Sequence, residues 1–445
     1  MKVFYNICFA ILLLANHSKA FSPTRNSEIQ EAEYLHRAIK AVTDVMVYDI
    51  YSPPVTSRTY AYISVAAYEI LRQNNPKYLS LAGQLHGLTP IPAPAAPLKY
   101  NLTLSAVHAV LTAGKTFVIS EEKLEAFEQI ILNEIKQNGI SEDIYQNSLD
   151  YGQLVADHIL KWAQQDRYKE TRALGNYQVK NDAASWKPTP PAYIKAIEPN
   201  WNKIRPFLLD SAAQFKPQEP PVFSTDSTSE FFKEVLTVYS QVNSNTTEQI
   251  DIAKFWDCNP FQMNIRGHVM YATKKISPNG HWMNITGLVC RKTGTNAVKS
   301  AEAYAFLAIT LADCFISCWD EKYRSIVIRP ETFINKYINP NWVPVLQTPP
   351  FPEYTSGHSV VSSGAAIILT QLFGDQFEFA DDSEVEFGLP IRNFKSFREA
   401  ADEAAISRLY GGIHYMPAIK NGQQEGFAIG AFFVDKLNIR SHLEK

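Results

Sequence analysis

The sequence predicts an all-α fold, a helical bundle. Most of the 445 residues belong to stretches with apolar side chains three and four positions apart, which is the period of an amphipathic helix. Several of these stretches begin at a Ser or Asn, and some end near a Gly, as helices commonly do. Neither a run of alternating strands nor a regular exchange of strands with helices is visible, so an all-β or α/β fold is not expected.

Four helices are predicted in the N-terminal half. The most complete pattern has Ser120 as a cap, acidic residues in the first turn and Gly139 at the end. A further stretch follows Pro53-Pro54, and another begins at Ser141. The four helices are expected at about residues 26–50, 57–73, 120–139 and 141–166.

Five more helices are predicted in the C-terminal half. The first has Asn245 and Glu248 at the spacing of a capping box, with Asn in place of the usual Ser or Thr. The others carry longer apolar runs. The five are expected at about residues 245–256, 299–328, 356–373, 395–410 and 423–437.

Two stretches depart from the helical period. Residues 88–97 form a proline-rich loop, and residues 186–221 are long, aromatic and dense in proline. A loop of that length within a compact domain usually covers the domain or serves its function, and the aromatic residues favour packing over disorder. We therefore expect one helical domain, residues 21–445, with an N-terminal half that wraps the C-terminal half.

The first twenty residues have the pattern of a secretory signal peptide. A basic start, Met1-Lys2, precedes a mostly apolar stretch, and small residues stand before Phe21. We predict cleavage after residue 20, and hence a periplasmic or secreted protein. No cysteine lies beside the cleavage site, so a lipid anchor there is not expected.

The charge of the chain argues against two classes of partner. The formal net charge is −3, and it becomes −5 once Lys2 and Lys19 leave with residues 1–20. A mildly acidic chain does not favour nucleic acid or an anionic membrane surface. The best candidate for a membrane span, residues 301–319, carries Glu302 and Asp313, which disfavours it. The oligomeric state is open, monomer or dimer.

Four cysteines remain after Cys8 leaves with the predicted signal peptide, too few for a disulfide scaffold. Cys314 and Cys318 lie one helical turn apart and are expected in the core. Cys258 and Cys290 could pair in an oxidising compartment, and the sequence leaves their redox state open. There is no CxxC motif of the kind that binds zinc.

Three segments of the C-terminal third carry a shared chemistry. Lys322 and Arg329 are seven residues apart on one helical face, Ser356-Gly357-His358 opens a predicted helix, and Arg408 precedes His414 by six residues. Any single piece has an ordinary structural explanation. The cations, however, stand in apolar sequence, and a buried unpaired charge is very costly. Together with a helix N-terminus they predict a site for a tetrahedral oxyanion.

These motifs resemble a known signature. The order Lys-x6-Arg-Pro, Ser-Gly-His and Ser-Arg-x5-His, within about residues 315–420, is similar to that of vanadium-dependent haloperoxidases and of the acid phosphatases that share their fold. The exported, helical chain of this length looks most like the iodoperoxidases of marine flavobacteria. The resemblance implies a helical bundle of the haloperoxidase/phosphatase type and vanadate as the cofactor.

The resemblance also implies a role for each motif residue. His414 would be the axial ligand of vanadium, or the phosphorylated residue in a phosphatase, and His358 the acid/base. Lys322 would bind the anion and take part in catalysis. The residues implied to hold the anion are Lys322, Arg329, Ser356, Gly357, Arg408 and His414, and those implied to be catalytic are His358, Lys322 and His414.

Two positions depart from the phosphatase pattern. Thr355 replaces the usual proline before Ser-Gly-His, and Ala418 stands where the phosphatases carry an Asp that orients the final histidine. A ligating histidine normally needs such a partner, so another acceptor must serve, a backbone carbonyl being one candidate. The departure disfavours a phosphohistidine nucleophile more than a vanadium ligand.

Two aromatic residues favour the peroxidase. Trp319 lies one turn before Lys322, and Phe351 lies seven residues before His358; both resemble positions on the halide side of haloperoxidases, although both could be core aromatics. The predicted function is vanadate-dependent oxidation of halide by hydrogen peroxide to hypohalous acid, with iodide favoured and bromide as a further substrate. The alternatives are an exported acid phosphatase with a phosphohistidine and a non-catalytic helical binding protein. The halide preference and the organic acceptor are not fixed by the sequence.

Further residues receive weaker assignments. Asp257 or Asn259 is expected to approach His358. Residues 277–287 are interpreted as a loop that could fold over the site, with His281 and Trp282 as candidates. Tyr354 and Tyr415 could face the pocket. The remaining histidines are expected to be structural or exposed, namely His36, His86, His108, His158 and His442.

Overall fold

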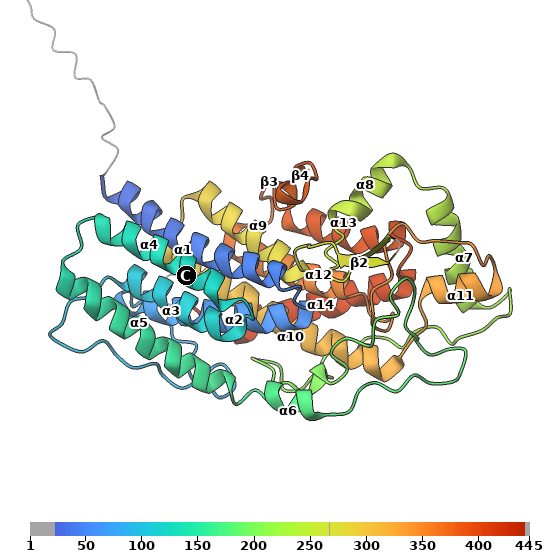
Figure 1. The fold of residues 1–445 in the computed structure, drawn as a ribbon, viewed down its shortest axis with the longest axis horizontal. Helices are drawn as coiled ribbons and strands as arrows, with labels where there is room; N and C mark the ends of the chain where they lie inside the picture. The colour runs from blue at the N-terminus through green and yellow to red at the C-terminus, as the bar shows by residue number, and fades with distance from the viewer. Residues whose placement is uncertain (1–22, 267, 441–445) are drawn as a thin grey trace, which may run out of the picture.

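The computed structural model describes residues 23–266 and 268–440. The predicted signal peptide, Cys8 and His442 lie outside these residues. The helices run mostly along the long axis of an elongated molecule (Figure 1), and the all-α prediction is confirmed. The helices before the long irregular segment are α1 (Pro23–Tyr48), α2 (Pro53–Leu71), α3 (Leu102–Phe117), α4 (Glu121–Gln137), α5 (Glu142–Ala163) and α6 (Tyr168–Ala173).

The second half holds the remaining helices and two short hairpins. The helices are α7 (Glu230–Asn243), α8 (Thr247–Phe255), α9 (Pro278–Thr293), α10 (Ala297–Ser325), α11 (Pro330–Tyr337), α12 (Gly357–Phe373), α13 (Phe397–Tyr410) and α14 (Met416–Lys436). The antiparallel hairpins are β1 (Met263–Arg266) with β2 (Val269–Ala272), and β3 (Phe379–Asp381) with β4 (Arg392–Phe394).

α2 and α10 form the centre of the molecule. Every residue of α2 is buried, because α3 packs on it from one side and α10 from the other. α10 also packs against α1, α9 and α12, so it joins the N-terminal helices to the C-terminal ones (Figure 1). By length and composition α10 could cross a bilayer, but its apolar window is entirely buried within the fold.

α12 lies in a layer with α10, α13 and α14. It packs so closely on α14 that a Cβ atom at Gly426 would stand 2.0 Å from the carbonyl oxygen of Val360. Gly422 and Gly430 on the same face of α14 meet α12 in the same way. These glycines let the two backbones approach, and they fix the position of the N-terminus of α12.

The segment 186–221 has no regular structure except for a short 3-10 turn at Trp201–Lys203, as the sequence predicts. Its Phe207 packs on Tyr62 and Trp162 of the N-terminal helices. Its backbone amides at 207–209 donate to the buried Asp313 of α10 at 2.7 to 2.9 Å. The carbonyl of Ile197 accepts from Trp319 Nε1 and Tyr323 Oη. This segment is therefore tied to the same helix that ends in Lys322.

Several local predictions are wrong. Residues 277–287 are not a loop, because Ser277 caps α9 and Pro278 occupies its first turn. The capping box of α8 uses Thr246 and Gln249 in place of Asn245 and Glu248. α14 begins at Met416, earlier than expected, and the sequence interpretation missed α3, α6, α7 and α11.

Candidate functional site

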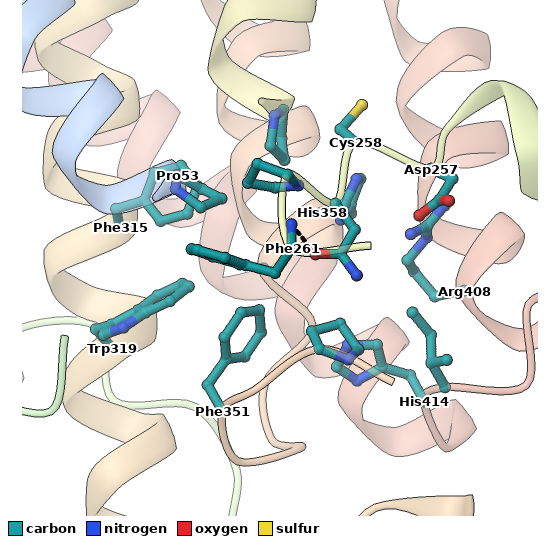
Figure 2. A pocket seen from close by; sticks show the side chains of 16 residues that line it. Pro53, Asp257, Cys258, Phe261, Phe315, Trp319, Phe351, His358, Arg408 and His414 are labelled. Carbon is teal, nitrogen blue, oxygen red and sulfur yellow. Dashed lines mark hydrogen bonds between the residues drawn. The ribbon is translucent and has the colours of Figure 1, made fainter. Parts of the chain in front are cut away.

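The three segments predicted to form the anion site meet at one cavity. Gly357, His358, Arg408 and His414 line it, whereas Lys322, Arg329 and Ser356 are not among its lining residues. The cavity lies where the end of α10, the proline-rich segment before α12, the start of α12 and the turn after α13 come together (Figure 2). A fourth wall comes from residues 256–261, called here the strap, which connects α8 to β1. Pro53 and Pro278, at the N-termini of α2 and α9, complete the lining.

Lys322 stands in the last turn of α10 and is fully buried. Its Nζ donates to the carbonyl oxygens of Pro352, Glu353 and Thr355 at 3.1, 3.2 and 2.5 Å. These bonds fold the proline-rich segment around the ammonium group. Burial lowers the pKa of Lys322 to about 8, because the charged form loses its hydration.

Arg329 precedes Pro330, which begins α11. The guanidinium donates from Nη1 to the carbonyl of Ile413 at 2.8 Å and from Nε to the carbonyl of Phe351 at 3.0 Å. The same Nη1 lies 3.1 Å from His414 Nε2. Burial lowers the pKa of Arg329 to about 10.

Arg408, in the last turn of α13, binds the strap. Its Nη2 donates to the carbonyls of Trp256 at 2.6 Å and Ala253 at 3.4 Å. Among the described residues, neither Lys322 nor Arg329 nor Arg408 has a carboxylate within ion-pair distance. Their hydrogen-bond partners are carbonyl groups, the His414 ring and the Ser407 hydroxyl, all of them neutral. The three buried cations therefore leave a strong positive potential, which an anion in the cavity would neutralise.

His414 is held by a carboxylate. Its Nδ1 lies 2.8 Å from Glu353 Oε1, and the backbone N–H of Tyr415 donates to the same oxygen at 3.0 Å. The partner of the His414 ring is therefore a carboxylate, and the suggestion that a backbone carbonyl orients this ring is wrong. Ala418 takes no part in orienting His414; its carbonyl accepts a hydrogen bond from Ser356 N at 3.0 Å. Burial, with Arg329 next, holds the pKa of His414 well below its usual range. In a neutral ring with Nδ1–H on Glu353, the Nε2 lone pair accepts from Arg329 Nη1 at the wall of the cavity, which His414 lines.

Glu353 is the functional residue that sequence reasoning missed. Burial raises its pKa to about 7. A signal was available, since Glu353 is the only acidic residue between Glu331 and Asp375. It also stands in a proline-rich segment just before the Ser-Gly-His motif.

Ser356 caps α12, as the sequence predicts. Its Oγ accepts from Ser359 N at 3.3 Å and from Ser359 Oγ at 2.9 Å. The hydroxyl proton of Ser356 thus remains available for a further acceptor. The N–H of Gly357 belongs to the first turn of α12, whose amides have no partner within the helix. Both groups can donate to an anion at this helix end.

His358 lines the cavity together with Asp257 and Asn259, the two residues predicted to approach it. Its Nε2 has no hydrogen-bond partner among the described residues. Burial, followed by the charge of Arg408, lowers the pKa of His358 well below its usual range. The ring is therefore neutral, with a nitrogen free to accept a proton. Asp257 forms an ion pair with Lys275.

Aromatic rings form the apolar side of the cavity (Figure 2). The rings of Trp319 and Phe351 have centroids 4.9 Å apart, and Lys322 Nζ lies 5.1 Å from the centroid of Phe351. Phe261 and Phe315 line the same cavity, although the sequence interpretation did not single them out. The predicted pair thus belongs to a larger apolar wall.

Other candidates lie elsewhere. His281 and Trp282 are buried inside α9 and do not line this cavity. Tyr354 and Tyr415 line a separate small cavity behind the proline-rich segment. All four cysteines of the described residues are free, so Cys258 and Cys290 are not paired; Cys314 and Cys318 lie in the core.

Comparisons with known proteins agree with this geometry. Residues 336–441 match the family model described as the VCPO second helical-bundle domain. The solved structure of the first bacterial vanadium-dependent iodoperoxidase is 50% identical, with 93% of this chain and 98% of that chain covered and a TM-score of 0.88. A bacterial vanadium-dependent chloroperoxidase in its holo form is 13% identical, covers 86% of this chain and 92% of its own, and has a TM-score of 0.67, a likeness of fold alone. No curated protein matches.

Proposed function

This chain belongs to the family of vanadium-dependent haloperoxidases, and from that premise we propose that it is an exported iodoperoxidase. Vanadate is the cofactor, and hydrogen peroxide and a halide are the substrates. The observation that carries the proposal is the cluster of three buried cations without ion-pair partners, set beside a neutral histidine and an aromatic wall. The 50% identical neighbour, described as an iodoperoxidase, supports iodide as the preferred halide.

The residues present fit vanadate. Lys322, Arg329 and Arg408 would neutralise the charge of its oxygens, while Ser356 Oγ and Gly357 N–H would donate to them. His414 would supply Nε2 as the ligand to vanadium, with its other nitrogen fixed by Glu353. When bound, vanadate acts as a Lewis acid that activates hydrogen peroxide towards the halide.

His358 is proposed to move the proton. Its Nε2 has no partner in the described structure and lies at the cavity wall, where hydrogen peroxide would arrive. A neutral imidazole can accept a proton from peroxide and return it to a product oxygen. Burial and the positive charge of Arg408 both disfavour the protonated form of His358. His358 would therefore readily release the proton that it had accepted from hydrogen peroxide.

The apolar wall is proposed to receive the halide. Trp319, Phe351 and Phe261 offer a surface suited to a large, weakly hydrated anion such as iodide. Lys322 Nζ lies 5.1 Å from the ring centroid of Phe351, so its charge, although not at the cavity lining, would add to the attraction of the halide. Bromide, with its stronger hydration, would enter at a greater cost.

The Glu353–His414 pair also suits a phosphohistidine, because a carboxylate orients the nucleophilic ring in the way that chemistry requires. An acid phosphatase is therefore the second candidate. It would need room for a leaving group on the side that Trp319 and Phe351 occupy.

One set of assays separates the candidates. Peroxide-dependent oxidation of iodide, bromide and chloride is measured with and without vanadate, beside hydrolysis of p-nitrophenyl phosphate. We expect vanadate-dependent activity with the highest kcat/KM for iodide. Phosphate ester hydrolysis without any halide oxidation would establish the phosphatase instead.

Export is proposed from the pattern of residues 1–20. Expression of the full chain with its natural N-terminus in a bacterial host, followed by N-terminal sequencing of the periplasmic fraction, should give a protein beginning at Phe21. Retention of Met1 in cytoplasmic protein would contradict export.

A further inference from the structure

A second cluster of metal-ligating side chains lies behind the strap. One ligand atom each of Cys258, His281 and Glu384 lies within 4.8 Å of the other two. Cys258 comes from the strap, His281 from the first turns of α9, and Glu384 from the turn that follows β3. All three side chains are buried. None is among the residues proposed to hold vanadate, although Cys258 also lines the cavity of that site.

The spacing of these atoms fits a tetrahedral metal ion. Cys258 Sγ lies 3.6 Å from His281 Nδ1, and the same Nδ1 lies 3.3 Å from Glu384 Oε1. Around Zn²⁺, with Zn–S near 2.3 Å and Zn–N and Zn–O near 2.0 to 2.1 Å, sulfur and nitrogen stand about 3.6 Å apart, and nitrogen and oxygen about 3.3 Å. Two edges of one tetrahedral face therefore already have the lengths that zinc requires, and the third, from Cys258 Sγ to the Glu384 carboxylate, is at most 4.8 Å.

The surroundings orient His281 as a metal ligand. Its Nε2 lies 2.7 Å from Asp381 Oδ2, and the indole of Trp256 stacks on the imidazole with centroids 4.6 Å apart and an angle of 19°. A carboxylate on the far nitrogen of a histidine is the usual second partner at metal sites. With the proton held on Nε2, the Nδ1 lone pair would face Cys258 and Glu384 when an ion is bound.

Glu384 provides an independent indication. Its Oε1 is buried and accepts no well-aligned hydrogen bond from the described residues; its nearest polar neighbour is His281 Nδ1, at an ion-pair distance of 3.3 Å. A buried carboxylate oxygen without a donor is costly. A cation between Oε1, Nδ1 and Sγ would satisfy all three atoms at once.

We propose that Cys258, His281 and Glu384 bind one Zn²⁺ ion, with a water in the fourth position. A thiolate, an imidazole and a carboxylate together favour zinc over the hard cations Mg²⁺ and Ca²⁺. The ion would fasten the strap to α9 and to the β3–β4 hairpin. Because the strap carries Phe261 and accepts bonds from Arg408, the ion would also stabilise one wall of the halide cavity. The site is independent of the proposed iodoperoxidase activity.

The ion has a short route to the site. The turn that carries Glu384 lies at the surface, where the β3–β4 hairpin projects from the bundle (Figure 1), and the adjacent Val385 is 48% exposed.

The test uses the mature protein saturated with vanadate. A chelator first removes any bound metal, the protein is then reloaded with vanadate, and Zn²⁺ is added last. After gel filtration, elemental analysis should find one zinc per chain in the wild type, and the unfolding temperature should rise with added Zn²⁺. The near-isosteric variants Cys258→Ser and Glu384→Gln should lose stoichiometric zinc, and Asp381→Asn should weaken binding about 10- to 100-fold. Cys290→Ser, at a buried cysteine outside the cluster, should bind zinc as the wild type does.

A spectroscopic measurement identifies the ligands. Co²⁺ in place of Zn²⁺ should give a thiolate-to-cobalt charge-transfer band that Cys258→Ser abolishes and Cys290→Ser retains. Absence of stoichiometric zinc in folded wild-type protein, or a cobalt spectrum without the thiolate band, overturns the proposal. The cluster would then be a hydrogen-bonded network centred on a protonated His281.

Discussion

His414 owes its state to two neighbours. Glu353 accepts at Nδ1, and Arg329 lies beside Nε2. The first neighbour fixes the tautomer, and the second disfavours the imidazolium, so the ring has the form that a metal ligand requires. The same carboxylate oxygen also receives the Tyr415 N–H, which anchors Glu353 independently of the histidine.

Replacement of His414 by Ala should abolish vanadate binding and halide oxidation, because the only proposed covalent ligand is lost. Binding is measured by equilibrium dialysis of vanadate, and activity by iodide oxidation. His158→Ala on α5, where the ring bonds only to Thr89, is the matched control and should keep both. Wild-type turnover in His414→Ala would contradict the assignment.

Glu353→Gln tests the role of the carboxylate that orients His414, while His414 itself stays in place as the proposed vanadium ligand. The amide oxygen can still accept from His414 Nδ1 and from Tyr415 N, but its neutral charge makes Nε2 less basic. Vanadate affinity should fall about 10- to 100-fold, with the fold unchanged by circular dichroism. An unchanged dissociation constant would show that the carboxylate charge has no part in holding the cofactor.

At the scale of elements, the position of the anion site depends on the contact between α12 and α14. The N-terminus of α12 carries Ser356 and Gly357, and its place is fixed by the glycines that let α14 approach. A side chain in this contact would push against backbone, which cannot move aside as a flexible side chain can.

Gly426→Ala should therefore lower the free energy of unfolding by about 1–3 kcal/mol or more, since the new methyl group would meet Val360 O. It should also weaken vanadate binding by displacing the helix end. Chemical denaturation measures the first effect and dialysis the second. Gly175→Ala, where an added Cβ has no neighbour within 4 Å, should be neutral; equal stability of the two variants would refute the close contact.

Individual elements differ in how far the sequence predicted them. α12 was predicted because Ser356 is a strong cap before a long apolar run. α3 was missed because most of its residues are buried, so its apolar residues do not follow a single face. The start of α9 was interpreted as a loop because Pro278, Asn279 and Gly280 suggest a turn, although a Ser cap followed by Pro is also a helix start.

For the whole molecule, buried carboxyl groups couple stability to pH. Glu425 of α14 accepts from Ser317 and Thr355 at 2.7 and 2.8 Å, and burial raises its pKa from 4.5 to about 7. Between these values the folded protein binds more protons at this group than the unfolded chain does. The contribution of Glu425 to stability is thus greatest at low pH and declines as pH rises towards 7.

Comparison of the wild type with Glu425→Gln isolates this effect, because the contributions of all other titrating groups are the same in both proteins and cancel in the difference of their unfolding free energies. The wild type minus variant difference in unfolding free energy should fall by roughly 2–3 kcal/mol between about pH 4.5 and 7.5. Glu122→Gln, at an exposed position of α4, should show no such trend. A difference that rises with pH would mean that Glu425 is ionised and stabilised in the fold.

The sequence by itself determined the helical class and the family, because the helical period and the three motifs are local patterns. It also predicted the anion site and its residues. Lys-x6-Arg-Pro, Ser-Gly-His and Ser-Arg-x5-His each lie within about two turns of helix. Only the tertiary structure decided which partners surround them: Glu353 beside His414, the strap beneath Arg408, and Cys258 with His281 and Glu384. These contacts join segments far apart in the chain, and a distance across the fold depends on how whole helices pack, which no local pattern encodes.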